Sequence, residues 1–174
     1  PVPKVVNNGE GSALLKNPNL IEEIVRKVSS AISKPLTVKV RIGFENEPVD
    51  IVEIAKRIED AGAAALAVHG RTRQQYYSGT ADWDTIRRVK EAITIPVIGN
   101  GDVDSPLKAE ALVKQTGCDA VMVGRAVRGN PWLFRELNHY FRTGELLERP
   151  SVEEIRKMIL RHARKQIELK GEFV

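Results

Sequence analysis

Hydrophobic residues in this chain gather in short runs that alternate with longer amphipathic stretches. Apolar runs of strand length occur four times, at residues 36–42, 64–68, 95–98 and 120–123. Between them, apolar residues recur every three or four positions and Gly or Pro stands near the ends, which predicts helices. Strand and helix follow one another roughly every 25–30 residues, as in βα units that share a parallel sheet. The pattern therefore predicts an α/β fold built from four βα units.

Residues typical of helix starts refine this prediction. Helices are expected to begin at Asn17-Pro18, Pro48, Asp82 and Ser105-Pro106. After the fourth unit the pattern becomes purely helical, with one helix from Asn130-Pro131 to Gly144. A further helix opens with a capping box at residues 151–154 and runs to about Lys170.

Four βα units are half of a (β/α)8 TIM barrel, which typically has about 250 residues. We therefore expect residues 1–148 to be the C-terminal half of such a barrel, with its opening half outside this sequence. Residues 1–4 read as a loop-like stretch, and the glycine-rich residues 7–12 are expected to form a long βα loop of the preceding unit. Residues 149–174 are expected to begin an α-helical domain.

Composition places the chain among ordinary globular proteins. It is 42% hydrophobic and 29% charged. No apolar run is long enough to span a membrane and no signal peptide opens the chain, so we expect no membrane partner. A single cysteine fits a reducing setting, so we expect a cytoplasmic protein. The single Cys118 excludes an internal disulfide, and we expect it to be a packed thiol rather than a nucleophile. The three histidines and one cysteine lack metal-ligand spacing, so no metal is expected.

The positive charge is concentrated near the C-terminus. The net charge of +4 is compatible with a polyanionic partner without requiring one. Residues 156–165 contain five Lys or Arg residues and no acid, and Lys157, Arg161, Arg164 and Lys165 lie away from the apolar helical positions. This run is either a solvated helix face or a surface for a polyanion.

Two glycine-containing loops each follow a predicted strand. Residues 99–102 read Gly-Asn-Gly-Asp, and residues 124–126 read Gly-Arg-Ala. Glycine lets the backbone approach a ligand closely, with its N–H groups free for phosphate oxygens. Either loop alone is compatible with a tight turn. At βα spacing, the pair predicts the phosphate site that follows strands seven and eight of a (β/α)8 barrel.

Two further strand ends carry chemically useful side chains. Lys39 shares one strand face with Thr37 and Arg41, which would point into a closed barrel. A lysine there is costly to desolvate unless it meets an anion, so Lys39 is predicted to contact a ligand or to form a structural ion pair. His69 ends the next strand and is either structural or a hydrogen-bond donor to a ring carbonyl of a ligand.

The loop at residues 71–80 is rich in cationic and flat side chains. Arg71, Arg73 and Tyr76 have the chemistry to contact phosphates and unpaired bases of RNA, or only to pack the loop.

Taken together, the ordered motifs VKVRIG (38–43), VHGRT (68–72), GNGD (99–102) and GRA (124–126) resemble those of the bacterial tRNA-dihydrouridine synthases. The segments at 1–5, 9–13 and 130–132 match that family as well, so the resemblance covers essentially the whole chain. It implies a flavoprotein with an FMN-binding (β/α)8 barrel and a C-terminal helical domain. Such enzymes use NADPH to reduce uridine to 5,6-dihydrouridine in tRNA.

The resemblance also implies roles for individual residues. Hydride would pass from flavin N5 to uracil C6, and a cysteine directly before Pro1 would protonate C5, with Lys39 and His69 in support. Because that cysteine lies outside the sequence, the 174 residues alone are expected to be inactive. The implied cofactor-binding residues are Lys39, His69, Asn100, Gly101, Asp102, Gly124 and Arg125. With tRNA as the implied substrate, the loop at 71–80 and the basic run supply the expected RNA-binding residues, which are Arg71, Arg73, Tyr76, Lys157, Arg161, Arg164 and Lys165.

Two alternatives stay open at this point. An FMN-dependent TIM-barrel oxidoreductase similar to dihydroorotate dehydrogenases would act on a small molecule, which needs neither the basic helix nor the loop at 71–80. A non-catalytic RNA-binding fragment would leave the phosphate loops and Lys39 without an obvious purpose.

Overall fold

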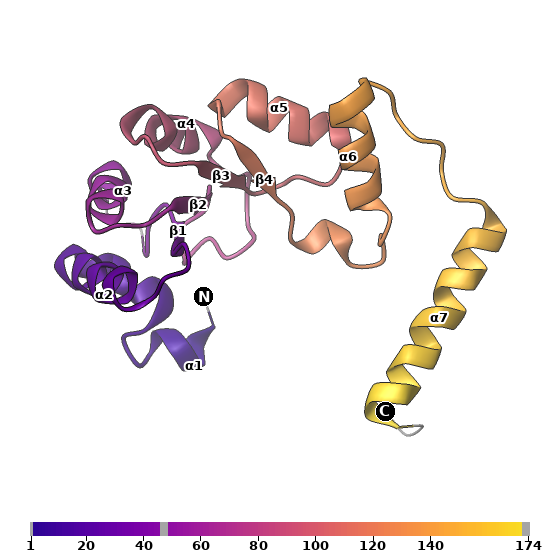
Figure 1. Cartoon of the computed structure of the whole chain (residues 1–174), viewed down its shortest axis with the longest axis horizontal. Helices are drawn as coiled ribbons and strands as arrows, with labels where there is room; N and C mark the ends of the chain where they lie inside the picture. The colour runs from indigo at the N-terminus through magenta and orange to yellow at the C-terminus, as the bar shows by residue number, and fades with distance from the viewer. Residues whose placement is uncertain (1, 46–48, 172–174) are drawn as a thin grey trace.

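Four parallel strands form the centre of the protein. The computed structural model describes residues 2–45 and 49–171. The strands are β1 (Thr37–Arg41), β2 (Ala65–His69), β3 (Val97–Asn100) and β4 (Ala120–Met122), and they lie side by side in sequence order. In Figure 1 the helices α2 to α5 form an arc along one side of this sheet. The α/β prediction is confirmed, and the arrangement is that of part of a (β/α)8 barrel.

The strand register brings chemically important positions into one row. Arg41 pairs with His69, His69 with Asn100, and Asn100 with Met122. All four are the last residues of their strands. A single row of side chains therefore crosses the sheet at its C-terminal edge.

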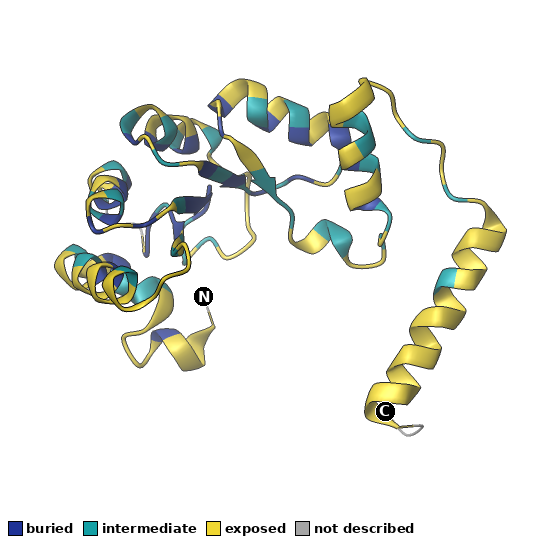
Figure 2. Ribbon diagram, viewed as in Figure 1, coloured by how far each residue is buried: buried dark blue, intermediate teal, exposed yellow. Residues whose placement is uncertain are grey.

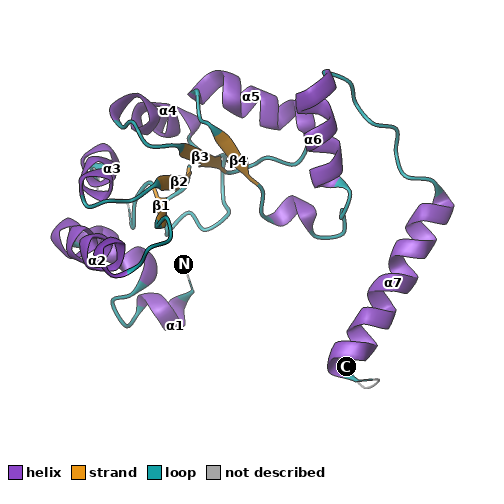
Figure 3. Ribbon diagram, viewed as in Figure 1, coloured by secondary structure: helices purple, strands orange, loops and turns teal. Residues whose placement is uncertain are grey.

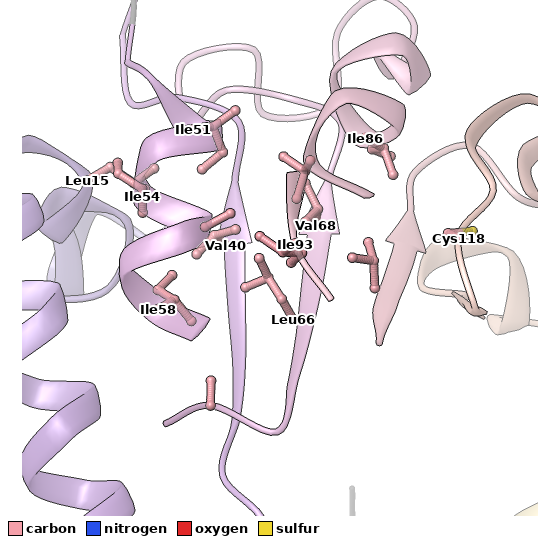
Figure 4. Close-up of a cluster of buried hydrophobic side chains, with 14 of the residues drawn as sticks. Leu15, Val40, Ile51, Ile54, Ile58, Leu66, Val68, Ile86, Ile93 and Cys118 are labelled. Atoms are coloured by element: carbon pink, nitrogen blue, oxygen red, sulfur yellow. The ribbon is translucent and has the colours of Figure 1, made fainter. Parts of the chain in front are cut away.

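The hydrophobic core lies between the sheet and the helices. Leu66, Val68 and Val97 are fully buried, and Ile54 and Ile58 of α3 pack with them in the same cluster. Figure 4 shows Leu66 and Val68 of the strands meeting Ile54 and Ile58 of the covering helix. Each strand thus turns alternate residues toward the helices and leaves the others facing the opposite side.

Helices connect the strands, with α2 (Pro18–Ala31) before β1. The connecting helices are α3 (Ile51–Asp60), α4 (Trp83–Ala92) and α5 (Pro106–Thr116). The expected starts after Asn17, at Asp82 and after Ser105 are confirmed, because each of these side chains accepts a hydrogen bond from a first-turn N–H.

Two expectations near helix starts differ from the structure. The expected start at Pro48 lies outside the described residues, and α3 begins at Ile51 because the Asp50 carboxylate accepts the N–H groups of Val52 and Glu53, both at 3.1 Å. The loop-like interpretation of residues 1–4 was wrong, because α1 (Pro3–Val6) begins within them. The loop expected at residues 7–12 is correct only up to Glu10, because the 3₁₀ helix η1 (Gly11–Lys16) begins at Gly11.

The C-terminal part is helical, as predicted. After the 3₁₀ turn η2 (Arg125–Val127), α6 (Leu133–Thr143) packs against α5 and ends at Gly144. The last helix, α7 (Val152–Lys170), has the predicted capping box at Ser151 and Glu154. Figure 3 shows α7 joined to the rest by an irregular connection, and none of its described residues is buried (Figure 2). Among the described helices, none combines the length and apolar character needed to cross a bilayer.

Candidate ligand-binding cleft at the strand ends

A cleft of about 990 Å³ lies at the C-terminal ends of the four strands. This volume is at the upper end of the range of small-molecule and cofactor sites. Every residue expected to bind a cofactor lines it: Lys39, His69, Asn100, Gly101, Asp102, Gly124 and Arg125. The four βα units thus bring residues that are up to 86 positions apart (125 minus 39) to one place.

His69 sits in the middle of the row, where it is 8% exposed. Burial, followed by the positive charges of Arg41, Lys39 and Arg71, lowers the pKa of His69 to about 4 against the weaker pull of Asp102. The imidazole is therefore neutral at neutral pH. In that form it has one N–H to donate and one nitrogen to accept.

Lys39 contributes an ammonium group to the same cleft. Partial burial, with Arg41 nearby, lowers the pKa of Lys39. No described carboxylate forms an ion pair with Lys39. The described residues therefore do not support the alternative in which Lys39 forms a structural ion pair. An unpaired ammonium in a cleft favours an anion or a polarised carbonyl as its partner.

The Asn100 side chain joins two strands at the edge of the cleft. Its Nδ2 donates to the Met122 carbonyl at 2.8 Å. This bond holds the amide plane across the gap between β3 and β4, where the two glycine loops begin.

The loop that follows β3 has an unusual backbone. Gly101 has a φ of +133° and Asp102 a φ of +60°. A Cβ on Gly101 would lie 2.6 Å from the Cβ of Ala81 and 3.3 Å from His69 Cδ2. Only glycine therefore fits where this loop passes against His69.

Gly124 and Arg125 form the other side of the cleft. A Cβ on Gly124 would meet no atom within 4 Å, so its backbone is open to an approaching group. The Arg125 guanidinium lies 4.3 Å from the centre of the Tyr77 ring, and its Nη2 is 3.4 Å from Asp102 Oδ1. Arginine suits phosphate through its forked donors.

Arg71 does not lie where an RNA-binding residue would. The expectation that it contacts RNA is corrected, because the side chain is 1% exposed and its guanidinium is engaged inside the protein. It pairs with Asp102, with Nη1 2.7 Å from Oδ1 and Nη2 2.9 Å from Oδ2. The same pairing turns the Asp102 carboxylate toward Arg71.

The remaining residues expected to bind RNA lie on two separate surfaces. Tyr76 is 50% exposed on the loop after β2, and Arg73 beside it lies over the Phe44 ring at 5.4 Å. The other four, Lys157, Arg161, Arg164 and Lys165, are exposed on α7 and do not line the cleft. Lys157 and Lys165 pair with acidic residues of α7, whereas neither arginine pairs with a described carboxylate.

Sequence reasoning assigned no binding role to several residues that line the cleft, among them Arg41 and Tyr77. Arg41 is 8% exposed, and its Nη1 donates to the carbonyls of Thr72 and Tyr76 at 2.8 and 3.2 Å. Its place on the Lys39 face of β1 was the available signal. Tyr77 belongs to the loop at 71–80 that the sequence marks as rich in flat side chains, but the sequence did not indicate which of its tyrosines faces the cleft.

Cys118 is 3% exposed and belongs to the hydrophobic core, as predicted. A Cβ on Gly99 would come within 2.9 Å of its sulfur, so the thiol packs directly beneath β3. Among the described side chains, no group of three or more His, Cys, Asp or Glu residues has metal-binding geometry.

Comparisons with known proteins agree with this architecture. A sequence model of the dihydrouridine synthase family matches residues 1–174. The chain is 47% identical over 173 residues to "tRNA-dihydrouridine synthase B" of Shewanella oneidensis, covering 99% of this chain and 54% of that protein. It is also 47% identical over 162 residues to the protein of that name from Pseudomonas putida, covering 93% and 48%. The protein of that name from Vibrio vulnificus is 44% identical over 174 residues, which cover 100% of this chain and 54% of that protein.

The chain thus spans about half the length of the curated relatives it matches. The family match extends over all four βα units and both C-terminal helices. This chain belongs to the dihydrouridine synthase family.

Proposed function

We propose that the protein carrying this sequence is a tRNA-dihydrouridine synthase that binds FMN in the cleft and uses NADPH to reduce uridine in tRNA. The observation that carries the proposal is the gathering of Lys39, His69 and Arg125 around one cleft in a chain of this family. We also assign the protein to the cytoplasm, where its proposed tRNA substrate is found.

The residues of the cleft fit a cofactor with an anionic end and a flat polar ring. Gly124 offers an open backbone, and Arg125 offers guanidinium donors to a phosphate. At the other end, Lys39 and the neutral His69 supply hydrogen-bond donors suited to ring nitrogens and carbonyls. Asn100 and Gly101 lie between these ends, where a linking chain would pass.

Bound FMN supplies the hydride chemistry of such a site. The ammonium of Lys39 stabilises negative charge that develops on a neighbouring ring. His69, uncharged at neutral pH, holds a carbonyl by hydrogen bonding and does not serve as the acid. The family resemblance implies that a cysteine directly before Pro1 protonates uracil C5. Cys118 is not its substitute, because it is buried in the core and does not line the cleft.

Recognition of tRNA is assigned to two surfaces. Tyr76 and Arg73 stand on the loop beside the cleft, where an unpaired base would enter. The exposed basic face of α7 provides contacts to the phosphate backbone, with Arg161 and Arg164 at its centre. We assign residues 1–148 to the catalytic barrel and 149–174 to the start of the helical tRNA-binding domain.

Reoxidation of the reduced flavin tests this proposal. The full-length protein is loaded with FMN, reduced by NADPH without oxygen, and mixed with unmodified tRNA, mature tRNA, uridine or orotate. Rapid return of the oxidised flavin spectrum with unmodified tRNA alone is the expected result. Reoxidation by orotate instead of tRNA would contradict it and favour a small-molecule oxidoreductase.

A further inference from the structure

The loop after β2 begins and ends at the same place, because its first and last residues, Gly70 and Asp82, are hydrogen-bonded to each other. The Gly70 N–H donates to the Asn100 carbonyl at 3.0 Å, and the Asp82 N–H donates to the Gly70 carbonyl at 2.6 Å. A Cβ on Gly70 would lie 2.8 Å from the Asp82 carbonyl oxygen, so glycine is required at this crossing. Residues 71–81 therefore form a closed loop at the edge of the cleft.

The guanidinium of Arg71 holds this loop from inside. Its Nε donates to the Ser78 carbonyl at 3.1 Å, and Nη2 also donates to the Gly79 carbonyl. A guanidinium at 1% exposure is tolerated only with its charge paired. Asp102, from the loop after β3, supplies that charge at 2.7 and 2.9 Å.

Asp102 lies between two guanidinium groups. Partial burial opposes its ionisation. Hydrogen bonds from Arg71 and from the Ala81 N–H, with the charges of Arg71 and Arg125, outweigh burial and lower the pKa of Asp102. The Arg71 contacts are short, whereas Arg125 Nη2 stands at 3.4 Å. Asp102 is thus mainly neutralised by Arg71 and holds Arg125 only loosely.

Arg125 has a second neighbour on the same closed loop. Its guanidinium faces the Tyr77 ring at 4.3 Å, and Tyr77 belongs to the segment whose carbonyls bind Arg71. Arg71 therefore controls both groups that flank Arg125, namely the charge of Asp102 and the place of Tyr77.

We propose that Arg71 is a positioning residue for the anion site of the cleft, leaving the Arg125 guanidinium available to the phosphate of the cofactor. Without Arg71, the uncompensated Asp102 carboxylate would bind Arg125 and repel the phosphate. The proposal rests on the proposed function, in which FMN occupies the cleft.

Affinities for FMN and riboflavin, which differ only in the phosphate, provide the test. Dissociation constants of both are measured on the full-length protein by quenching of flavin fluorescence. The preference for FMN over riboflavin should fall about tenfold in Arg71→Met, a change equivalent to about 1.4 kcal/mol. The riboflavin constant should change by less than roughly threefold, because the ring contacts remain.

A double variant separates charge from damage to the fold. Arg71→Met with Asp102→Asn removes the uncompensated carboxylate and should recover most of the FMN preference. The control Arg87→Met removes an exposed arginine paired with Asp84 and should leave the preference as in wild type.

Two results would overturn the proposal: an unchanged preference in Arg71→Met, or no recovery in the double variant. The double variant decides the question even if Arg71→Met does not fold, because it removes the buried guanidinium together with its partner carboxylate. Failure of the wild type to bind either flavin would instead refute the proposed function. Equal binding of both flavins by the wild type would refute the phosphate role of Arg125.

Discussion

The low pKa of His69 makes the stability of the protein depend on pH in a defined window. His69 is 8% exposed, and burial, Arg41, Lys39 and Arg71 together lower its pKa to about 4, opposed by Asp102. In the unfolded chain a histidine titrates near 6.5. Between these values the unfolded state binds more protons than the folded state, so the free energy of unfolding falls as the pH drops from about 6.5 toward 4.

The size of the effect follows from the two pKa values. Between pH 7.5 and pH 5.0, the linkage relation gives a loss of about 2 kcal/mol from His69 alone. Urea unfolding of wild type and His69→Gln at both pH values isolates this contribution, because all other groups titrate in both proteins. The wild type should lose about 2 kcal/mol more than the variant. The exposed His162, changed to Gln, serves as the matched control.

NMR gives an independent reading of the same quantity. The chain has three histidines, so the Cε1–H signal of His69 is identified by its disappearance in His69→Gln. That signal should stay in its neutral position down to about pH 5. A midpoint near pH 6.5, or equal stability loss in wild type and variant, would refute the reasoning.

Three further changes test other parts of the account. Lys39→Ala should weaken FMN binding by about tenfold, because the cleft loses a positive charge that would contact the cofactor. The melting temperature should not fall, because the Lys39 ammonium has no described ion-pair partner to lose. A lower melting temperature with normal flavin affinity would instead make Lys39 a structural residue. Gly101→Ala should lower the free energy of unfolding by roughly 1–3 kcal/mol, because φ is +133° and the new Cβ would lie 2.6 Å from the Cβ of Ala81. Gly129→Ala, where φ is +77° and no atom lies within 4 Å of the new Cβ, should lower it by less. Thermal unfolding of both variants measures the difference. The double variant Arg161→Ala with Arg164→Ala should reduce the slope of log tRNA affinity against log salt concentration by roughly 1.5, because two phosphate contacts are lost. An unchanged slope would show that the basic face of α7 is solvated and does not contact tRNA.

Much of the fold was predictable because it depends on local patterns. Short apolar runs separated by amphipathic stretches predicted the four strands. Residues such as Asn17, Asp82 and Ser105 predicted helix starts, because their side chains can accept hydrogen bonds from first-turn N–H groups, as they do in the structure. The opening segment was missed because its helical turns depend on burial of Val6 and Leu15 against the core. Such burial is set by tertiary contacts that no local pattern reveals.

The cleft was predictable to the extent that parallel strands align their ends. Lys39, His69, Asn100 and Gly124 were placed together because each stands at or near the C-terminal end of a strand. The role of Arg71 was not predictable in this way. Its side chain pairs with a carboxylate 31 residues away, and whether it faces solvent or Asp102 depends on how the loop closes at Gly70.

Formation of dihydrouridine tests the central claim most directly. The full-length protein, with FMN and NADPH, is incubated with unmodified tRNA, and the digested nucleosides are analysed by mass spectrometry. The account predicts a dihydrouridine peak with wild type and a strongly reduced peak with Lys39→Ala. No peak from a wild-type protein that binds flavin would contradict the assignment of tRNA as substrate. No peak and no bound flavin would contradict the assignment of the cleft itself.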